Sequence, residues 1–282
     1  MIGPDAAAES AYRAAQDSTG VGAHLDAAEV LGRALSILPN ELPEHLGLRI
    51  AQGDALRLAG DPAHLPLLHD AATEALGQQQ PKRLAAAVFA LLQLGATSVV
   101  GQIDDRTLTL TQQALSTLQE PEDIALVSGA ASLSLSMSGQ AEESLAAFHR
   151  AERLATSRAT RDAILPFAFL ALGHPDHREH RARLTEELIH SGRTENHPRA
   201  LWEGLHQRFS AHALGGSQAG MATAHEEMVT LMPRLGDVGR AWSIRYQEAA
   251  LAHLDGDDDR AEALAFDAYR IFSPVSEARA AS

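Results

Sequence analysis

The sequence predicts an all-α protein, an α-solenoid of about seven antiparallel helical hairpins. Alanine and leucine, two strong helix formers, dominate a chain of 282 residues in which 45% are hydrophobic and 4% aromatic. Apolar residues recur at i, i+3, i+4 and i+7, and no window alternates with the period of two that marks a strand. Glycine turns such as Gly60-Asp61 and Gly139-Gln140 recur at intervals of roughly 35–42 residues, which indicates a repeat.

Caps and prolines set the limits of the predicted helices. Asp61-Pro62 is a helix start, because Asp is a favoured N-cap residue and proline is tolerated in the first turn. Pro166 lies inside a helical pattern and should kink or start that helix, since it lacks a backbone donor. The predicted helices are residues 5–18, 23–38, 43–59, 62–78, 82–97, 104–118, 122–138, 140–156, 159–172, 176–191, 197–214, 217–235, 238–254 and 257–272. Residues 1–273 form a single helical-repeat domain in this prediction, and residues 274–282 form a disordered tail.

Charge and cysteine content exclude several classes of function. A formal net charge of −14 gives a surface that repels phosphate, so we expect no nucleic-acid binding by this chain and no membrane association. Without cysteine the chain has neither disulfides nor Cys-ligated metal sites. The N-terminal ten residues do not read as a signal peptide, and no apolar run is long enough to span a membrane. These features predict a cytoplasmic protein.

Several segments resemble the tetratricopeptide repeat, a hairpin of two helices. Residues 53–61, GDALRLAGD, look like the end of its first helix and the turn that follows, and residues 139–151, GQAEESLAAFHRA, look like its second helix. Trp202 and Trp242, forty residues apart, begin successive hairpins in the same frame. The pattern also recurs in the first and last hairpins, at Ala27, Leu31, Ala34 and Pro39, and at Ala249, Ala261, Ala265 and Ala268. The resemblance implies a tetratricopeptide-like superhelix.

The long repeat pitch, of roughly 39 residues, and the Ala/Leu/Arg/Gly/Asp-rich style are similar to a narrower group. They resemble the helical-repeat region of large ATP-binding transcriptional regulators of the LuxR type, found in high-GC bacteria. The chain has no G-x-x-x-x-G-K-[ST] motif and no basic recognition helix near its C-terminus. It therefore reads as an excised sensor region of such a regulator or as a stand-alone relative.

In the resembled family the first helices line a concave groove, and the matching positions of this chain are mainly apolar at the centre and polar near the C-terminus. Such a surface suits a peptide, a partner protein or a small apolar ligand. The alternative is that a frame shift of one or two residues makes the apolar members part of the core. The candidate groove residues are Phe89, Leu92, Leu126, Leu133, Met137, Phe167, Leu170, His206 and Tyr246, with Tyr12, Gln16, Ile50, Asp54, Arg57, Val99, Glu203, Ser210 and His253 in the same frame.

Four residues form the best candidate acid–base set. Glu203 and His206 are three residues apart on one predicted helix and share a face, and Tyr246 and His253 are seven apart on a later first helix. If both faces line the groove, a histidine–carboxylate pair could move a proton there. The alternative is hydrogen bonding that stabilises adjacent helices.

The other clusters do not predict a metal site. His174, His177, His180 and His190 are separated by charged residues and by Pro175, so we expect a solvated turn and helix start. The aspartates at 255 and 257–259 lack the spacing of a calcium loop and suit the N-terminus of a helix instead. The serines at 128, 132, 134, 136 and 138 indicate a tight interface between helices.

The leading functional hypothesis is a non-catalytic binding scaffold or sensor without cofactors or metals. The rival is a cofactor-independent enzyme that acts on a hydrophobic small molecule, for example of secondary metabolism, through His206, Glu203, Tyr246 and His253. A third possibility is an assembly module that forms a homodimer, because the ends of a solenoid expose apolar faces.

Overall fold

The computed structural model describes residues 3–93, 104–235 and 238–273, and every regular element in those ranges is helical. The predicted all-α class is therefore confirmed. Contacts divide the chain into two compact units, Met1–Thr160 (unit 1) and Arg161–Ser282 (unit 2), which are described separately below. The single domain over residues 1–273 stays a prediction, and the predicted tail at residues 274–282 lies outside the described residues.

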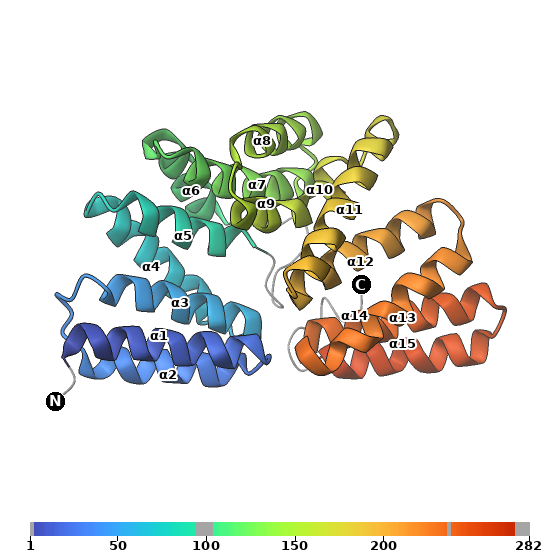
Figure 1. The fold of residues 1–282 in the computed structure, drawn as a ribbon, viewed down its shortest axis with the longest axis horizontal. Helices are drawn as coiled ribbons and strands as arrows, with labels where there is room; N and C mark the ends of the chain where they lie inside the picture. The colour runs from blue at the N-terminus through green and yellow to red at the C-terminus, as the bar shows by residue number, and fades with distance from the viewer. Residues whose placement is uncertain (1–2, 94–103, 236–237, 274–282) are drawn as a thin grey trace. The chain divides into compact units, whose positions relative to one another are not determined.

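The described residues of unit 1 form four helical hairpins, drawn from blue to green in Figure 1. Most helix ends lie within two residues of their predicted positions, because glycine turns and capping residues act locally. Gly60, for instance, ends the third helix in the left-handed conformation, with φ of 79°. The helices are α1 (Pro4–Gly20), α2 (His24–Ile37), α3 (His45–Ala59), α4 (His64–Gly77), α5 (Pro81–Leu92), α6 (Asp105–Thr117), α7 (Pro121–Met137) and α8 (Ala141–Leu154).

The described residues of unit 2 belong to three further hairpins, of which the first is interrupted and begins at Arg158, just before the boundary between the units. The predicted helix 159–172 breaks into α9 (Arg158–Ile164), a 3-10 turn (Leu165–Phe167) and α10 (Ala168–Ala171), as expected from the missing backbone donor of Pro166. Its partner begins with a second 3-10 turn, Pro175–His177. The remaining helices are α11 (Arg178–Thr194), α12 (Pro198–Leu214), α13 (Gln218–Leu235), α14 (Val238–Leu254) and α15 (Asp258–Phe272).

In unit 1 the first helices of successive hairpins lie side by side. α3 contacts both α1 and α5, and α5 contacts α7, in addition to the contacts that each helix makes with its neighbours along the chain. The helices on the inside of a curved array lie closer to one another than those on the outside. The first helices therefore form the inner layer of unit 1, as the solenoid prediction requires.

Small residues allow the two helices of a hairpin to approach closely. Of the five serines predicted at a tight interface, Ser128, Ser132 and Ser134 of α7 are buried, whereas Ser136 is half-buried and Ser138 is exposed. The hydroxyl of Ser144 in α8 donates to the Ser132 carbonyl oxygen at 2.7 Å, so α8 touches the backbone of α7. In the second hairpin, a Cβ on Gly53 would lie 2.6 Å from the side chain of Leu68.

We expect Gly53→Ala to destabilise the protein by about 1–3 kcal/mol, because the added methyl group overpacks the α3–α4 contact. The free energy of unfolding in urea, followed by circular dichroism, measures this loss. Gly77→Ala at the end of α4 is the matched control, since its added Cβ meets nothing within 4 Å. Equal stability of the two variants would contradict a packing role for Gly53.

The carboxylate of Glu122, in the first turn of α7, holds the segment that follows α8. Its Oε1 accepts hydrogen bonds from the backbone N–H groups of Thr156 and Ser157, both at 2.9 Å, and from the Thr156 hydroxyl at 2.5 Å. Hydrogen bonds from Thr156, Thr160 and Ser157 favour the ionised form and lower the pKa of Glu122 to about 2.

We expect an NMR titration of the Glu122 side-chain carboxyl carbon to give a midpoint near 2, below the ordinary pKa of 4.5. Because the folded-state pKa is the lower one, the stabilisation is complete above pH 4.5 and is lost as the pH falls through about 2. Glu122→Gln should remove this share of the acid dependence of unfolding. A midpoint near 4.5 would show that the carboxylate is free in solution.

Candidate functional site

Both tryptophans of the chain lie on neighbouring first helices of unit 2, and each stacks on a residue one turn later. The rings of Trp202 and His206 in α12 lie 5.0 Å apart between centroids, at 20°. The rings of Trp242 and Tyr246 in α14 lie 5.7 Å apart, at 18°. The spacing i, i+4 places each pair on one helix face, and the two pairs repeat with the forty-residue pitch.

Arg240 joins these two helices. Its Nη2 lies 3.0 Å from Oε1 of Glu203 in α12, and its guanidinium carbon lies 5.0 Å from the centre of the Trp202 ring. The Trp202 side chain is buried, and among the described residues its Nε1 has no hydrogen-bond partner. We call Trp202, Glu203, His206, Arg240, Trp242 and Tyr246 the tryptophan face.

The electrostatics of this face keep His206 neutral. Burial has the largest effect and lowers the pKa of His206, because a charged imidazolium loses its hydration there. The carboxylate of Glu203 opposes this shift, and the Arg240 guanidinium adds to it. At pH 7 His206 is therefore an uncharged ring that can accept or donate a hydrogen bond.

The structure brings together only part of the predicted acid–base set among the described residues. The Glu203 carboxylate acts electrostatically against the burial that lowers the pKa of His206, whereas Tyr246 is 54% exposed and packs on Trp242. Nδ1 of His253 lies 2.8 Å from Oδ1 of Asp258, at the start of α15. Sequence reasoning missed Arg240. The signal in the sequence was its separation of 37 residues from Glu203, which is close to the repeat pitch.

The apolar groove candidates differ in how far they reach the surface. Leu92, Leu133 and Phe167 are buried, with exposed fractions of 4%, 6% and 7%. Phe89, Leu126 and Met137 are half-buried, and Leu170 is 42% exposed. Of the other candidates, Ile50 and Arg57 are buried, and Asp54 and Ser210 are half-buried. Tyr12 and Gln16 are exposed, Tyr12 to 44%. Val99 lies outside the described residues.

Two buried polar contacts repeat with the same pitch and were not predicted. The Thr185 hydroxyl of α11 donates to Oε1 of Gln207 in α12 at 3.1 Å. Forty residues later, Nδ1 of His225 in α13 lies 3.2 Å from Oε1 of Gln247 in α14. The amide of Gln207 also donates to the carbonyl oxygens of Leu165 and Pro166, at 3.2 and 3.1 Å. The sequence does contain a signal for these repeated contacts, because each of the two glutamines follows a tryptophan by five residues.

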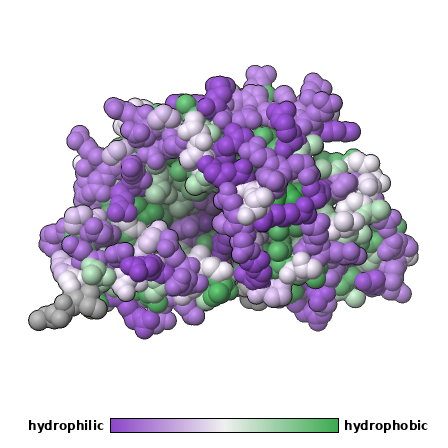
Figure 2. Space-filling model, viewed as in Figure 1, coloured by the Kyte–Doolittle hydropathy of each residue, from purple (hydrophilic) through white to green (hydrophobic). Residues whose placement is uncertain are grey.

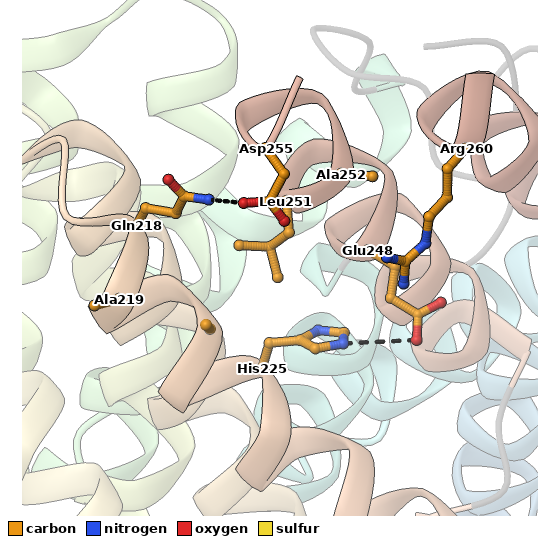
Figure 3. Close-up of a pocket in the computed structure, with 9 residues that line it drawn as sticks. Gln218, Ala219, His225, Glu248, Leu251, Ala252, Asp255 and Arg260 are labelled. Atoms are coloured by element: carbon orange, nitrogen blue, oxygen red, sulfur yellow. Dashed lines mark hydrogen bonds and ion pairs between the residues drawn. The ribbon is translucent and has the colours of Figure 1, made fainter. Parts of the chain in front are cut away.

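A separate cavity of about 540 Å³ opens between α13, α14 and the start of α15. In Figure 3 the His225 ring points toward Glu248, whose Oε1 lies 3.7 Å from the ring Nε2, and Arg260 extends toward Glu248 from α15. On the other side, the Gln218 amide donates to Asp255 at 2.5 Å. The lining residues are Gln218, Ala219, Ala222, His225, Glu248, Leu251, Ala252, Asp255 and Arg260.

The aspartates near this cavity cap a helix, as predicted. Oδ1 of Asp257 accepts from the backbone N–H of Arg260 at 3.2 Å, and Asp258 and Asp259 lie in the first turn of α15. The face drawn in Figure 2 is mainly hydrophilic, with hydrophobic residues gathered in patches. Within the described residues, no helix combines the length and apolar character needed to cross a bilayer.

Comparison with known proteins supports the fold. No protein-family model matches the chain, and no curated protein matches it. A solved structure that does match is a tetratricopeptide repeat protein from Parabacteroides merdae, with a TM-score of 0.51 and 14% sequence identity over 97% of this chain and 98% of that one. The chain therefore has a tetratricopeptide-like helical-repeat fold.

We expect the stability of the protein to fall more steeply below pH 6.5 than that of a His206→Gln variant. The lowered pKa means that the unfolded chain takes up a proton at position 206 before the folded one does. The contribution of His206 is therefore complete above pH 6.5 and is lost as the pH falls below it. Urea unfolding of both proteins at pH 8 and pH 5 measures the difference, and parallel losses would show that His206 is hydrated.

Proposed function

We propose that this chain is a non-catalytic binding scaffold and that the tryptophan face of unit 2 holds a peptide segment of a partner protein. The supporting observation is the placement of its aromatic residues. The chain has only two tryptophans and three tyrosines, and both tryptophans and one tyrosine lie on this face. Tryptophan, tyrosine and arginine are the residues most enriched at the energetic centres of protein interfaces.

The face combines a rigid base with an accessible edge. Trp202 is fixed by the His206 ring and by Arg240 from the next first helix, so little side-chain entropy is lost when a partner binds. Tyr246 and Leu254 of α14 are 54% and 53% exposed and provide apolar contact area. A partner with apolar and cationic side chains suits this surface, because the chain carries a net charge of −14.

The resemblance to large ATP-binding LuxR-type regulators suggests a context for this binding. In such a protein the helical array would act as a sensor, and ligand or partner binding would be passed to neighbouring domains. A small apolar ligand and a partner protein are both compatible with this role. We also propose that the chain is located in the cytoplasm.

The enzymatic alternative rests on His206, which is neutral at pH 7 and lies within electrostatic reach of Glu203. A neutral histidine can act as a general base. Against it, Tyr246 and His253 contact Trp242 and Asp258, and the cavity between α13, α14 and α15 is lined by none of the four residues. The tryptophan face therefore favours binding over proton transfer.

Selection of random 16-residue peptides displayed on phage, followed by calorimetry with the selected peptides, tests the scaffold proposal. We expect Tyr246→Ala to weaken binding at least tenfold, about 1.4 kcal/mol, because a central aromatic contact is lost. Tyr12→Ala on α1 is the matched control, since Tyr12 is also an exposed tyrosine, at 44%. Peptides that bind both variants equally would place the binding surface elsewhere, and failure to select any peptide would count against the proposal.

A further inference from the structure

The cavity between α13, α14 and α15 has a counterpart one hairpin earlier, between α11, α12 and α13. Equivalent positions of the two places lie forty residues apart, as the Thr185–Gln207 and His225–Gln247 contacts show. The counterpart is filled by a histidine ring. His212, near the end of α12, lies so close to the start of α13 that a Cβ on Gly220 would be 2.3 Å from its Nδ1.

Forty residues after His212 the chain has Ala252, which lines the cavity. A methyl group there replaces an imidazole ring. The cavity of about 540 Å³ therefore corresponds to the space that a side chain of the protein occupies one hairpin earlier. This volume is within the range of small-ligand sites, roughly 300–1,000 Å³.

Two further differences place opposite charges at the cavity. Asp255 and Arg260 occupy the positions that Gly215 and Gly220 hold in the preceding hairpin. Oδ1 of Asp255 accepts a hydrogen bond from the Gln218 amide at 2.5 Å, and its Oδ2 has no hydrogen-bond partner in the described part of the chain. Among the same residues, the Arg260 guanidinium forms neither a hydrogen bond nor an ion pair. One carboxylate oxygen and one guanidinium are thus available to a ligand.

Glu248, the third charged residue of the lining, already has partners. Its Oε2 lies 2.5 Å from Nη1 of Arg245, and its Oε1 lies 3.7 Å from Nε2 of His225. The charges left for recognition are therefore those of Asp255 and Arg260, one negative and one positive.

An apolar surface separates the two charges. Figure 3 shows Gln218, which binds Asp255, and Arg260 on opposite sides of Leu251. The apolar lining consists of Ala219, Ala222, Leu251 and Ala252. A ligand with a single charge would leave either Asp255 or Arg260 unpaired. A ligand with both charges and an apolar group satisfies the whole lining, because each charge gains a charge-assisted hydrogen bond.

We propose that this cavity binds a free α-amino acid with an apolar side chain, in its zwitterionic form. The ligand carboxylate pairs with the Arg260 guanidinium, whose planar donors suit a carboxylate. The ligand ammonium donates to Oδ2 of Asp255, and the side chain lies on Leu251 and the alanine methyl groups. Internal residues of a peptide carry neither charge, so a free amino acid fits this cavity better than a protein segment does. The site shares no residue with the tryptophan face.

Calorimetry of the full chain with alanine, valine, leucine, isoleucine, methionine and phenylalanine, each up to 10 mM, tests the ligand class. We expect at least one of these amino acids to bind. Its N-acetyl derivative lacks the ammonium charge and its amide lacks the carboxylate charge. Each derivative should bind more weakly by about tenfold or more, because one charge-assisted hydrogen bond is lost.

Variants of the lining test the site itself. Arg260→Gln and Asp255→Asn should each weaken binding by about tenfold or more. Ala252→His should abolish binding, because it restores the ring that fills the preceding hairpin. Arg270→Gln and Ala263→His are the matched controls, since both alter exposed residues of α15 outside the lining, and they should bind like the wild type.

Thermal unfolding without ligand shows that each variant is folded, and the exposed positions 255 and 260 keep the test decisive if Ala252→His destabilises the protein. A wild-type chain that binds none of the six amino acids at 10 mM overturns the proposal. So does an N-acetyl derivative that binds as tightly as its parent, or full affinity in Arg260→Gln. Tyr246→Ala should retain amino-acid binding, which separates this site from the proposed peptide site.

Discussion

The packing of each hairpin depends on how closely two helix backbones can approach. A Cβ on Gly204 of α12 would lie 2.6 Å from the Ile189 side chain of α11, and one on Gly192 of α11 would lie 2.4 Å from the backbone nitrogen of Leu201 in α12. Gly53 has the same role in α3. Glycine, alanine and serine at these contacts let larger residues on either side interdigitate, as in the unit 2 cluster of Trp202, Leu205, Phe209, Met221, Ala224 and Met228.

This constraint explains which features could be predicted from the sequence. Helix ends depend on local signals such as Gly60 and Asp257. The pairing of helices into hairpins depends on small residues at regular spacing. Both kinds of signal can be recognised in a single sequence. The side of a helix that faces the core is harder to predict, since a shift of one residue turns a side chain by about 100°. Leu92 and Leu133 fall in the core, while Phe89 and Leu126 on the same helices are half-buried.

Contacts between hairpins were the least predictable part of the candidate site. Arg240 reaches Glu203 and Trp202 across 37 and 38 residues, and its role depends on how the hairpins stack. Glu203 and His206 were predictable as a pair because they share one helix. Tyr246 and His253 share a later helix, but Tyr246 stacks on Trp242 there and His253 contacts the Asp258 carboxylate. The forty-residue repeat of these contacts is recognised only when the structure shows buried pairs such as Thr185 and Gln207.

The break at Pro166 carries a consequence for how this sequence can change over evolution. The 3-10 turn leaves the carbonyl oxygens of Leu165 and Pro166 facing the next hairpin, where the Gln207 amide satisfies both. An apolar residue at 207 would remove one hydrogen bond from each carbonyl group, whereas a regular helix at 166 would leave the amide without these acceptors. Among relatives, the proline and the glutamine should be inherited together or lost together, although forty-one positions separate them.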